Sequence, residues 1–158
     1  MTKKHISFSE LKTWAECPYK HKLKYIDGIN GFTGNAFTAF GTAIHSVCEF
    51  IAKGELEPID YDEHFDLAFL AELKKLEEKP DNQLITDMRQ QGREISPSVF
   101  PQLKSHFGNY EVFSTEEMLY QTIEELNYKW HLKGFIDLVI KTEDGKYHIL
   151  DWKSCSWG

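Results

Sequence analysis

The sequence contains little cysteine. Its three cysteines, Cys17, Cys48 and Cys155, are widely spaced along 158 residues. Small secreted domains that depend on disulfides carry many cysteines at close spacing. The composition therefore argues against a disulfide-stabilised scaffold, and reduced thiols in a cytoplasmic protein are the simpler interpretation.

A long hydrophobic run is also missing. No apolar stretch approaches the roughly 20 residues that a transmembrane helix needs, and no apolar signal core follows the basic start of the chain. We therefore expect neither membrane insertion nor secretion. Aromatic residues make up 14% of the chain and charged residues 27%. These values predict an ordered protein, and the length suits one domain over residues 1–158.

Positive charge is scarce overall, with a formal net charge of −7. Proteins that bind nucleic acid usually present a basic surface to the phosphates. The charges are unevenly distributed, however. Residues 1–33 carry six lysines against three acidic residues, whereas residues 49–87 carry twelve acidic residues against four lysines. A basic segment at the start of the chain is compatible with DNA binding, so the net charge does not decide the question.

The first two thirds of the sequence, residues 7–108, read as helical. Ser7 and Glu10 match a capping box, which predicts a helix start at Ser7, and Cys17-Pro18 interrupts that helix. A second short helix is expected over residues 19–26. Apolar residues at steps of three and four predict an amphipathic helix over residues 36–53. Further helices are expected over residues 61–79, with an acidic outer face, and over residues 83–107, with a break near Pro97 and Pro101.

The remaining sequence, residues 109–154, reads as a sheet. Aromatic and β-branched residues predict strands over residues 110–113, 118–123, 128–140 and 147–153. The Asp-Gly pair within residues 142–145 predicts a tight hairpin turn between the last two strands. Helices followed by an antiparallel β-meander make the expected fold class α+β.

The last hairpin brings charged residues onto largely apolar strands. Alternation along residues 147–153 places Asp151 and Lys153 on one face, and Asp137 lies within an apolar run of the partner strand. Buried carboxylates and amines are costly to desolvate unless they bind a cation or one another. A divalent metal that polarises a phosphate and activates water meets this requirement. A structural Asp–Lys ion pair at the end of a hairpin is the alternative.

These segments resemble a known family. Gly134-Phe135-Ile136-Asp137 and Asp151-Trp152-Lys153-Ser154 resemble the paired motifs of the RecB-type branch of the PD-(D/E)XK nucleases. Gly41 and His45 resemble the family's Gly-x-x-x-His helix. The segment from Ser9-x-Leu11 to Cys17-Pro18 is similar to its N-terminal motif, except that His21 and Lys22 replace an expected bulky residue.

The resemblance implies a restriction-endonuclease-like core and a Mg²⁺- or Mn²⁺-dependent DNA nuclease. Asp137, Asp151 and Lys153 would be catalytic, with Asp137 and Asp151 also binding metal. His45 is the expected additional ligand, although a packed core histidine is the alternative. The family often supplies another acid from the preceding strand. Of the neighbours Glu116 and Glu117 only one can point at the site, and we favour Glu117; a solvated acidic turn is the alternative.

The N-terminal segment supplies candidate DNA contacts, namely Trp14, Tyr19, Lys20, Lys22 and Lys24, as a surface for base stacking and phosphate contact. A solvated helix face is the alternative. Some relatives in this family hold an iron–sulfur cluster through four cysteines, one near the N-terminus and three beyond the lysine. Only Cys155 lies beyond Lys153, so we expect no such cluster in this chain and interpret Cys48 as a core residue.

The sequence departs from the family after Lys153. RecB-type nucleases continue with a helix that carries a Gln-x-x-x-Tyr motif, and no such motif follows here. We therefore expect an incomplete C-terminal part of the fold, completed by a missing segment or a second polypeptide, and weak or absent activity of this chain alone. Two functions stay open: an exonuclease in recombination, repair or phage DNA processing, and a non-catalytic DNA-binding or assembly subunit.

Overall fold

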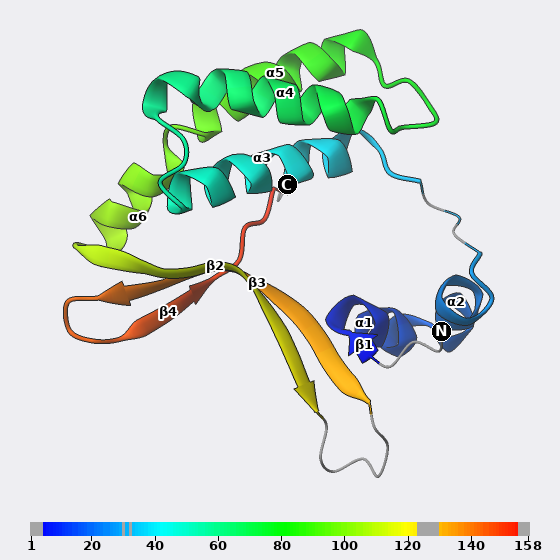
Figure 1. Ribbon diagram of the computed structural model, residues 1–158. Coiled ribbons are helices and arrows are strands. Elements are labelled where there is room, and N and C mark those ends of the chain that lie inside the picture. Colours follow the sequence, from blue (N-terminus) through cyan, green and yellow to red (C-terminus); the bar gives the residue numbers. More distant parts are fainter. Residues whose placement is uncertain (1–4, 30, 32, 123–129, 155–158) are drawn as a thin grey trace. The chain divides into compact units, whose positions relative to one another are not determined.

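A computed structural model describes residues 5–29, 31, 33–122 and 130–154 (Figure 1). The chain divides into two compact units. The first unit comprises Met1–Phe32 and Glu117–Ile136, and the second comprises Thr33–Glu116 and Asp137–Gly158. Each unit is described by itself below.

Short helices and a short strand begin the first unit. Strand β1 (His5–Ser7) leads into helix α1 (Phe8–Glu16), whose first turn is capped because the Ser7 hydroxyl accepts the Glu10 N–H at 3.2 Å. The predicted cap at Ser7 and the interruption at Cys17-Pro18 are thus confirmed. The single helix predicted over residues 19–26 is instead α2 (Pro18–His21) followed by a π-helical turn, η1 (Lys22–Ile26).

The second unit is built around helix α3 (Ala36–Ala52), close to its predicted bounds. Asn35 and Thr38 form a capping box at its start, in which the side-chain oxygen of each residue accepts the backbone N–H of the other. After the short turn η2 (Pro58–Asp60) come α4 (Tyr61–Leu73), α5 (Asn82–Ile95) and α6 (Val99–Phe107). Helix α4 ends six residues before the predicted end at Lys79, and the expected break before residue 107 lies between α5 and α6.

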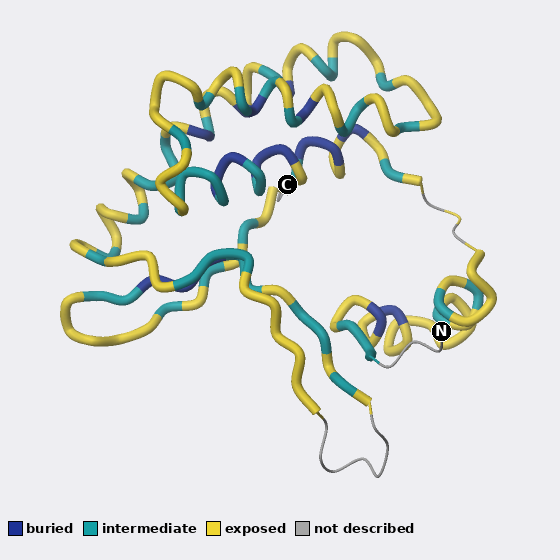
Figure 2. Tube along the Cα trace, in the orientation of Figure 1, coloured by how far each residue is buried: buried dark blue, intermediate teal, exposed yellow. Residues whose placement is uncertain are grey.

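An aromatic cluster holds α3 against α4 and α5. Phe40 contacts the rings of Phe65 and Phe69 edge-on, with centroids 5.7 and 6.0 Å apart, and both α4 rings are fully buried. Figure 2 shows the buried positions concentrated along α3. Gly92 of α5 lies directly against Phe65, because a Cβ atom placed there would come within 2.0 Å of the ring. Each buried phenylalanine contributes about 2–3 kcal/mol by leaving water.

The sheet contains four strands, the last three being β2 (Tyr110–Thr122), β3 (His131–Thr142) and β4 (Tyr147–Leu150). The α+β class is confirmed. The sheet is mixed rather than purely antiparallel, however, because β1 pairs in parallel with β3 in the first unit, whereas β4 pairs antiparallel with β3 in the second. The two strands predicted over residues 110–113 and 118–123 are one strand, β2, which ends at Thr122. The parts of these predictions at Ile123 and Tyr128 lie outside the described residues.

The hairpin between β3 and β4 has the predicted turn. Gly145 has φ +80° and donates its N–H to the Thr142 carbonyl at 2.9 Å, which is why glycine suits this position. Strand β4 ends at Leu150 and not at Lys153 as predicted. Across the described ranges, none of the helices combines the length and apolar character that crossing a lipid bilayer requires.

Candidate metal centre

Helix α3 presents His45 beside its buried stripe. Ala43, Ile44 and Val47 face the core, whereas the His45 side chain keeps 32% of its surface exposed. Gly41 precedes His45 by one helical turn and therefore lies on the same face. A Cβ atom at Gly41 would lie 2.8 Å from the Ser154 hydroxyl, so the glycine allows the segment after β4 to approach this face of the helix.

Asp137 enters the centre from β3. Its side chain is only 11% exposed and is followed by three buried residues, Leu138, Val139 and Ile140. A carboxylate at such a place needs a hydrogen-bond partner. One of its oxygens accepts the backbone N–H of Trp152 at 2.7 Å. The aspartate is therefore held by the backbone that follows β4.

The peptide groups of Trp152 connect the side chains of His45 and Asp137. Its N–H binds Asp137, and its carbonyl oxygen lies 2.9 Å from His45 Nε2. The other ring nitrogen, Nδ1, lies 3.6 Å from the Asp137 carboxylate. The Trp152 indole packs against the core and has its ring 6.2 Å from that of Phe100. Core packing thus fixes the backbone that orients His45 and Asp137.

Glu116 completes the group. Ligand atoms of His45, Glu116 and Asp137 all lie within 4.8 Å of one another. The pKa of the Glu116 carboxyl is raised, first by burial and then by the negative charges of Asp137 and Glu49. The sequence analysis favoured Glu117, whereas the structure brings Glu116 to the group.

The backbone explains this difference. Glu116 has φ +49°, a left-handed conformation that costs energy for a residue with a side chain. Regular alternation is lost at this point of β2, and Ser114, Thr115 and Glu116 are all partly buried in succession. The Thr115 hydroxyl also donates to the Asp137 carbonyl at 3.2 Å, which keeps the two strands together beside the group. Glu117 is exposed.

The donor set suits a hard divalent cation. Two carboxylates supply anionic oxygens, and a neutral imidazole is an acceptable ligand for Mn²⁺ beside them. The raised pKa of Glu116 reflects the cost of holding a second negative charge beside Asp137, and a bound cation would offset this repulsion. The residues present therefore fit the Mg²⁺ or Mn²⁺ that the sequence analysis expected.

Asp151 and Lys153 lie beside this group without joining it. Their side chains form an ion pair with each other and are 61% and 65% exposed. Lys153 also donates to the Trp152 carbonyl at 3.2 Å. This ion pair is the alternative that the sequence left open for Asp151 and Lys153, and the catalytic roles of the two residues stay a prediction. Asp151 is outside the three-residue group as described.

An open pocket of about 390 Å³ adjoins the group, lined by Gly41, Thr42, His45, Ser46, Glu49 and Glu116. Sequence reasoning missed Ser46 and Glu49. Glu49 follows His45 by four residues, so helical spacing alone could have placed Glu49 on the same face as His45. Glu49 pairs with Lys53 one turn further along α3.

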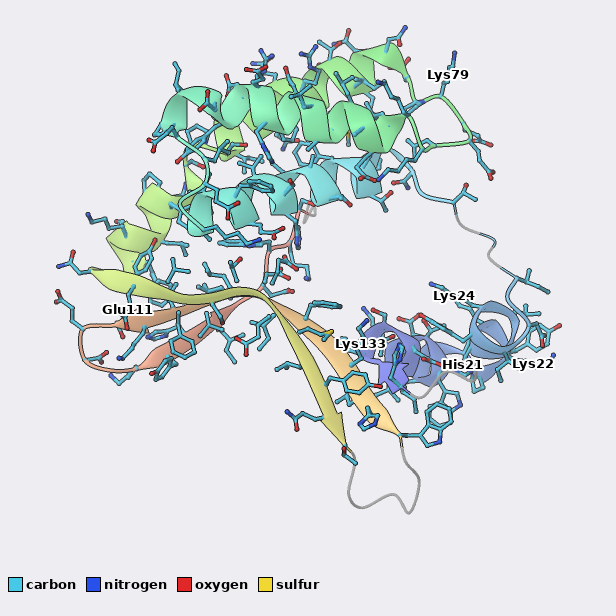
Figure 3. The ribbon with its side chains drawn as sticks, in the orientation of Figure 1. His21, Lys22, Lys24, Lys79, Glu111 and Lys133 are labelled. Carbon is cyan, nitrogen blue, oxygen red and sulfur yellow. The ribbon has the colours of Figure 1, made fainter. Side chains whose placement is uncertain are left out.

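The predicted DNA-binding residues belong to the first unit and are exposed. Trp14 and Tyr19 have 57% and 67% of their surface exposed, and Figure 3 shows Lys22 and Lys24 on the turn that follows α2. Lys22 pairs with Asp27 at 2.6 Å. A second pocket, of about 500 Å³, lies between apolar residues and three of these side chains; its lining comprises Cys17, Tyr19, Lys20, Leu23, Lys24, Ile29 and Gly31.

The two described cysteines differ in environment. Cys17 is exposed and accepts the Lys20 N–H at 3.5 Å as the cap of α2. Cys48 is 1% exposed within the core, as predicted, and burial raises the pKa of its thiol to about 12, with Asp137 adding to the effect. Cys155 lies outside the described residues.

A family model described as the PD-(D/E)XK nuclease superfamily matches residues 5–157, which is nearly the whole chain. A search of curated proteins found no match.

Proposed function

Because the chain belongs to the PD-(D/E)XK nuclease superfamily, we propose that it hydrolyses phosphodiester bonds of DNA in a reaction that depends on Mg²⁺ or Mn²⁺. The observation that carries this proposal is the His45–Glu116–Asp137 group, tied to the backbone between Asp151 and Lys153. We assign the chain to the RecB-type branch on the motifs that contain these residues, and we treat residues 1–158 as one nuclease domain.

The chain's own residues have distinct tasks. Asp137, Glu116 and His45 would hold the cation, with Asp151 as a further carboxylate next to them. When bound, the cation supplies Lewis-acid activation of the phosphate and lowers the pKa of a water. Lys153 would orient this water or offset negative charge on the phosphate. The water oxygen forms a bond to phosphorus, the ester P–O bond breaks, and the leaving oxygen takes a proton.

Asp151 and Lys153 can take up these roles at small cost. Exposed ion pairs contribute little to stability because water screens them, and this pair is more than half exposed. The hydrogen bonds of the Trp152 peptide groups keep the backbone between the two residues in place. A substrate phosphate could therefore recruit Lys153 without disturbing the fold.

We further propose that the first unit contacts the DNA strand. Tyr19 and Trp14 offer exposed rings for base stacking, and Lys20, Lys22 and Lys24 offer cations for phosphates. These contacts would favour a strand with accessible bases, as at a DNA end. This supports an exonuclease that acts in recombination, repair or phage DNA processing.

A non-catalytic DNA-binding or assembly subunit is the second candidate. One observation favours it: Asp151 pairs with Lys153 and stays outside the three-residue group. A protein that had lost the reaction could keep this pair as a surface contact.

Cleavage assays separate the two functions. We expect the whole protein to cleave linear and single-stranded DNA in a Mg²⁺- or Mn²⁺-dependent reaction, and its Asp137→Asn and Lys153→Ala variants to lose this cleavage. Resistance of circular DNA would identify an exonuclease. Metal-independent cleavage, or cleavage by both variants at the rate of the parent protein, would refute the proposed reaction. DNA binding without any cleavage would favour the second candidate.

A further inference from the structure

A serine and a histidine meet at the edge of the candidate metal centre. Ser46 follows His45 on α3 and lines the same open pocket. Its hydroxyl oxygen lies 3.0 Å from Nε2 of His64 on α4. Ser46 therefore connects His64 of α4 to the pocket that adjoins the group formed by His45, Glu116 and Asp137.

The Ser46 hydroxyl behaves differently from other helical hydroxyls of this chain. Hydroxyl groups within helices usually donate to the carbonyl four residues earlier. Several here do so at 2.7–3.0 Å, namely Thr13, Thr42, Thr86 and Ser96. Ser46 instead forms its hydrogen bond across the interface between two helices. Its orientation is therefore set by a ring from α4.

His64 is well placed to orient this hydroxyl. Its ring packs on Phe50 of α3 with centroids 4.6 Å apart. The next residue, Phe65, is fully buried in the aromatic cluster that joins α3 to α4. The ring position is thus determined by the packing of the two helices.

Few side chains of this pocket can donate a hydrogen bond to a phosphate. Its acidic members, Glu49 and Glu116, offer only acceptor oxygens when ionised, and the Thr42 hydroxyl already donates to Thr38. A phosphodiester likewise presents only acceptor oxygens. When Nε2 of His64 carries the hydrogen, the ring donates to Ser46, and the Ser46 hydrogen is free to point into the pocket.

We propose that Ser46 donates a hydrogen bond to a non-bridging oxygen of the phosphate being cleaved, and that His64 is a positioning residue for Ser46. This inference rests on the proposed nuclease function and adds a substrate-contacting residue to it. The bond becomes stronger as negative charge grows on the phosphate oxygens, so its loss affects the reaction more than the binding of DNA or metal.

The test compares single-turnover cleavage of linear DNA at saturating Mn²⁺ with Mn²⁺ affinity measured by calorimetry. We expect Ser46→Ala to lower the cleavage rate about 10- to 100-fold, with KM for DNA and Mn²⁺ affinity within about twofold of the parent protein. Ser46→Thr keeps the hydroxyl and should restore most of the rate. Thr86→Ala removes a helical hydroxyl in α5 and is the matched control, with an unchanged rate.

His64→Phe keeps a ring on Phe50 but removes Nε2. It should match Ser46→Ala, and the double variant should be no slower than either, because the two residues act as a unit. Full activity of Ser46→Ala, or losses that multiply in the double variant, would overturn this inference alone. A parent protein that binds Mn²⁺ but does not cleave DNA would overturn the proposed function and this inference with it.

Discussion

Asp137 has two roles that substitutions can separate. Its carboxylate accepts the Trp152 N–H at 2.7 Å, and it is one of three side chains in the candidate metal centre. Asp137→Ala leaves a nearly buried N–H without its acceptor, which costs about 1–3 kcal/mol. Asp137→Asn keeps an oxygen that can accept this bond and removes a negative charge that acts on Glu116.

We therefore expect the two substitutions to differ in their effect on stability and to agree in their effect on activity. Without divalent ions, Asp137→Ala should lower the free energy of unfolding by about 1–2 kcal/mol, whereas Asp137→Asn should leave it unchanged or raise it by a few tenths. Both variants should lose metal binding and DNA cleavage. Urea unfolding followed by circular dichroism in EDTA measures the first effect, and Mn²⁺ titration measures the second.

Asp151→Asn is the control, because its carboxylate is exposed and its ion pair contributes less than about 1 kcal/mol. It should unfold like the parent protein. If Asp137→Asn is as unstable as Asp137→Ala, the hydrogen bond to Trp152 does not hold the aspartate as described. If Asp137→Asn still binds Mn²⁺ with parental affinity, Asp137 is not a ligand.

Three further predictions concern other parts of the chain. Mn²⁺ at a hundred times its Kd should stabilise the parent protein by about 2.7 kcal/mol and raise its melting temperature. Glu116→Gln should abolish this rise, whereas Glu117→Gln should retain it. Gly92→Ala should lower unfolding free energy by about 1–3 kcal/mol or more, because the new methyl group meets Phe65. Hydrogen bonds from Arg89 and Arg93 lower the pKa of Asp66 below its ordinary value of 3.8. The ionised Asp66 therefore stabilises the fold at pH values above 3.8, and this stabilisation is lost as the pH falls through the lowered pKa. Asp66→Asn should cost roughly 1 kcal/mol at neutral pH and little in acid.

Each of these has a measurement that would contradict it. Equal Mn²⁺ effects in the Glu116 and Glu117 variants would remove Glu116 from the centre. For Gly92, thermal melts should be compared with Gly134→Ala, where no atom lies within 4 Å of the added Cβ; equal melting temperatures would argue against close packing on Phe65. For Asp66, the stability difference between the parent protein and Asp66→Asn is measured at neutral and at strongly acidic pH. The same difference at both pH values would show that Arg89 and Arg93 do not stabilise the Asp66 charge.

The sequence predicted the parts of the fold that depend on local chemistry. The Ser7 cap, the break at Cys17-Pro18, the amphipathic helix α3 and the turn at Gly145 all follow from preferences of single residues or from helical periodicity. Strand β1 could not be foreseen, since three residues carry no readable alternation and the pairing partner lies more than 120 positions away.

The candidate site was only partly predictable for a related reason. His45 and Asp137 were found through motifs and do come together in the structure. Glu116 was missed in favour of its neighbour because its left-handed backbone has no signature in the sequence, glutamate having no preference for it. The Ser46–His64 contact depends on how α4 packs on α3, which the sequence pattern of neither helix specifies alone.

The contacts of Trp152 also bear on how this protein can change in evolution. His45 and Asp137 form hydrogen bonds with its backbone atoms, whereas its side chain packs against the core. Selection for the reaction therefore acts on the position of that backbone and not on the identity of residue 152. Other bulky apolar side chains could replace the indole during sequence drift as long as they fill the same space, so the residue between Asp151 and Lys153 is constrained by volume while its two neighbours are constrained by charge.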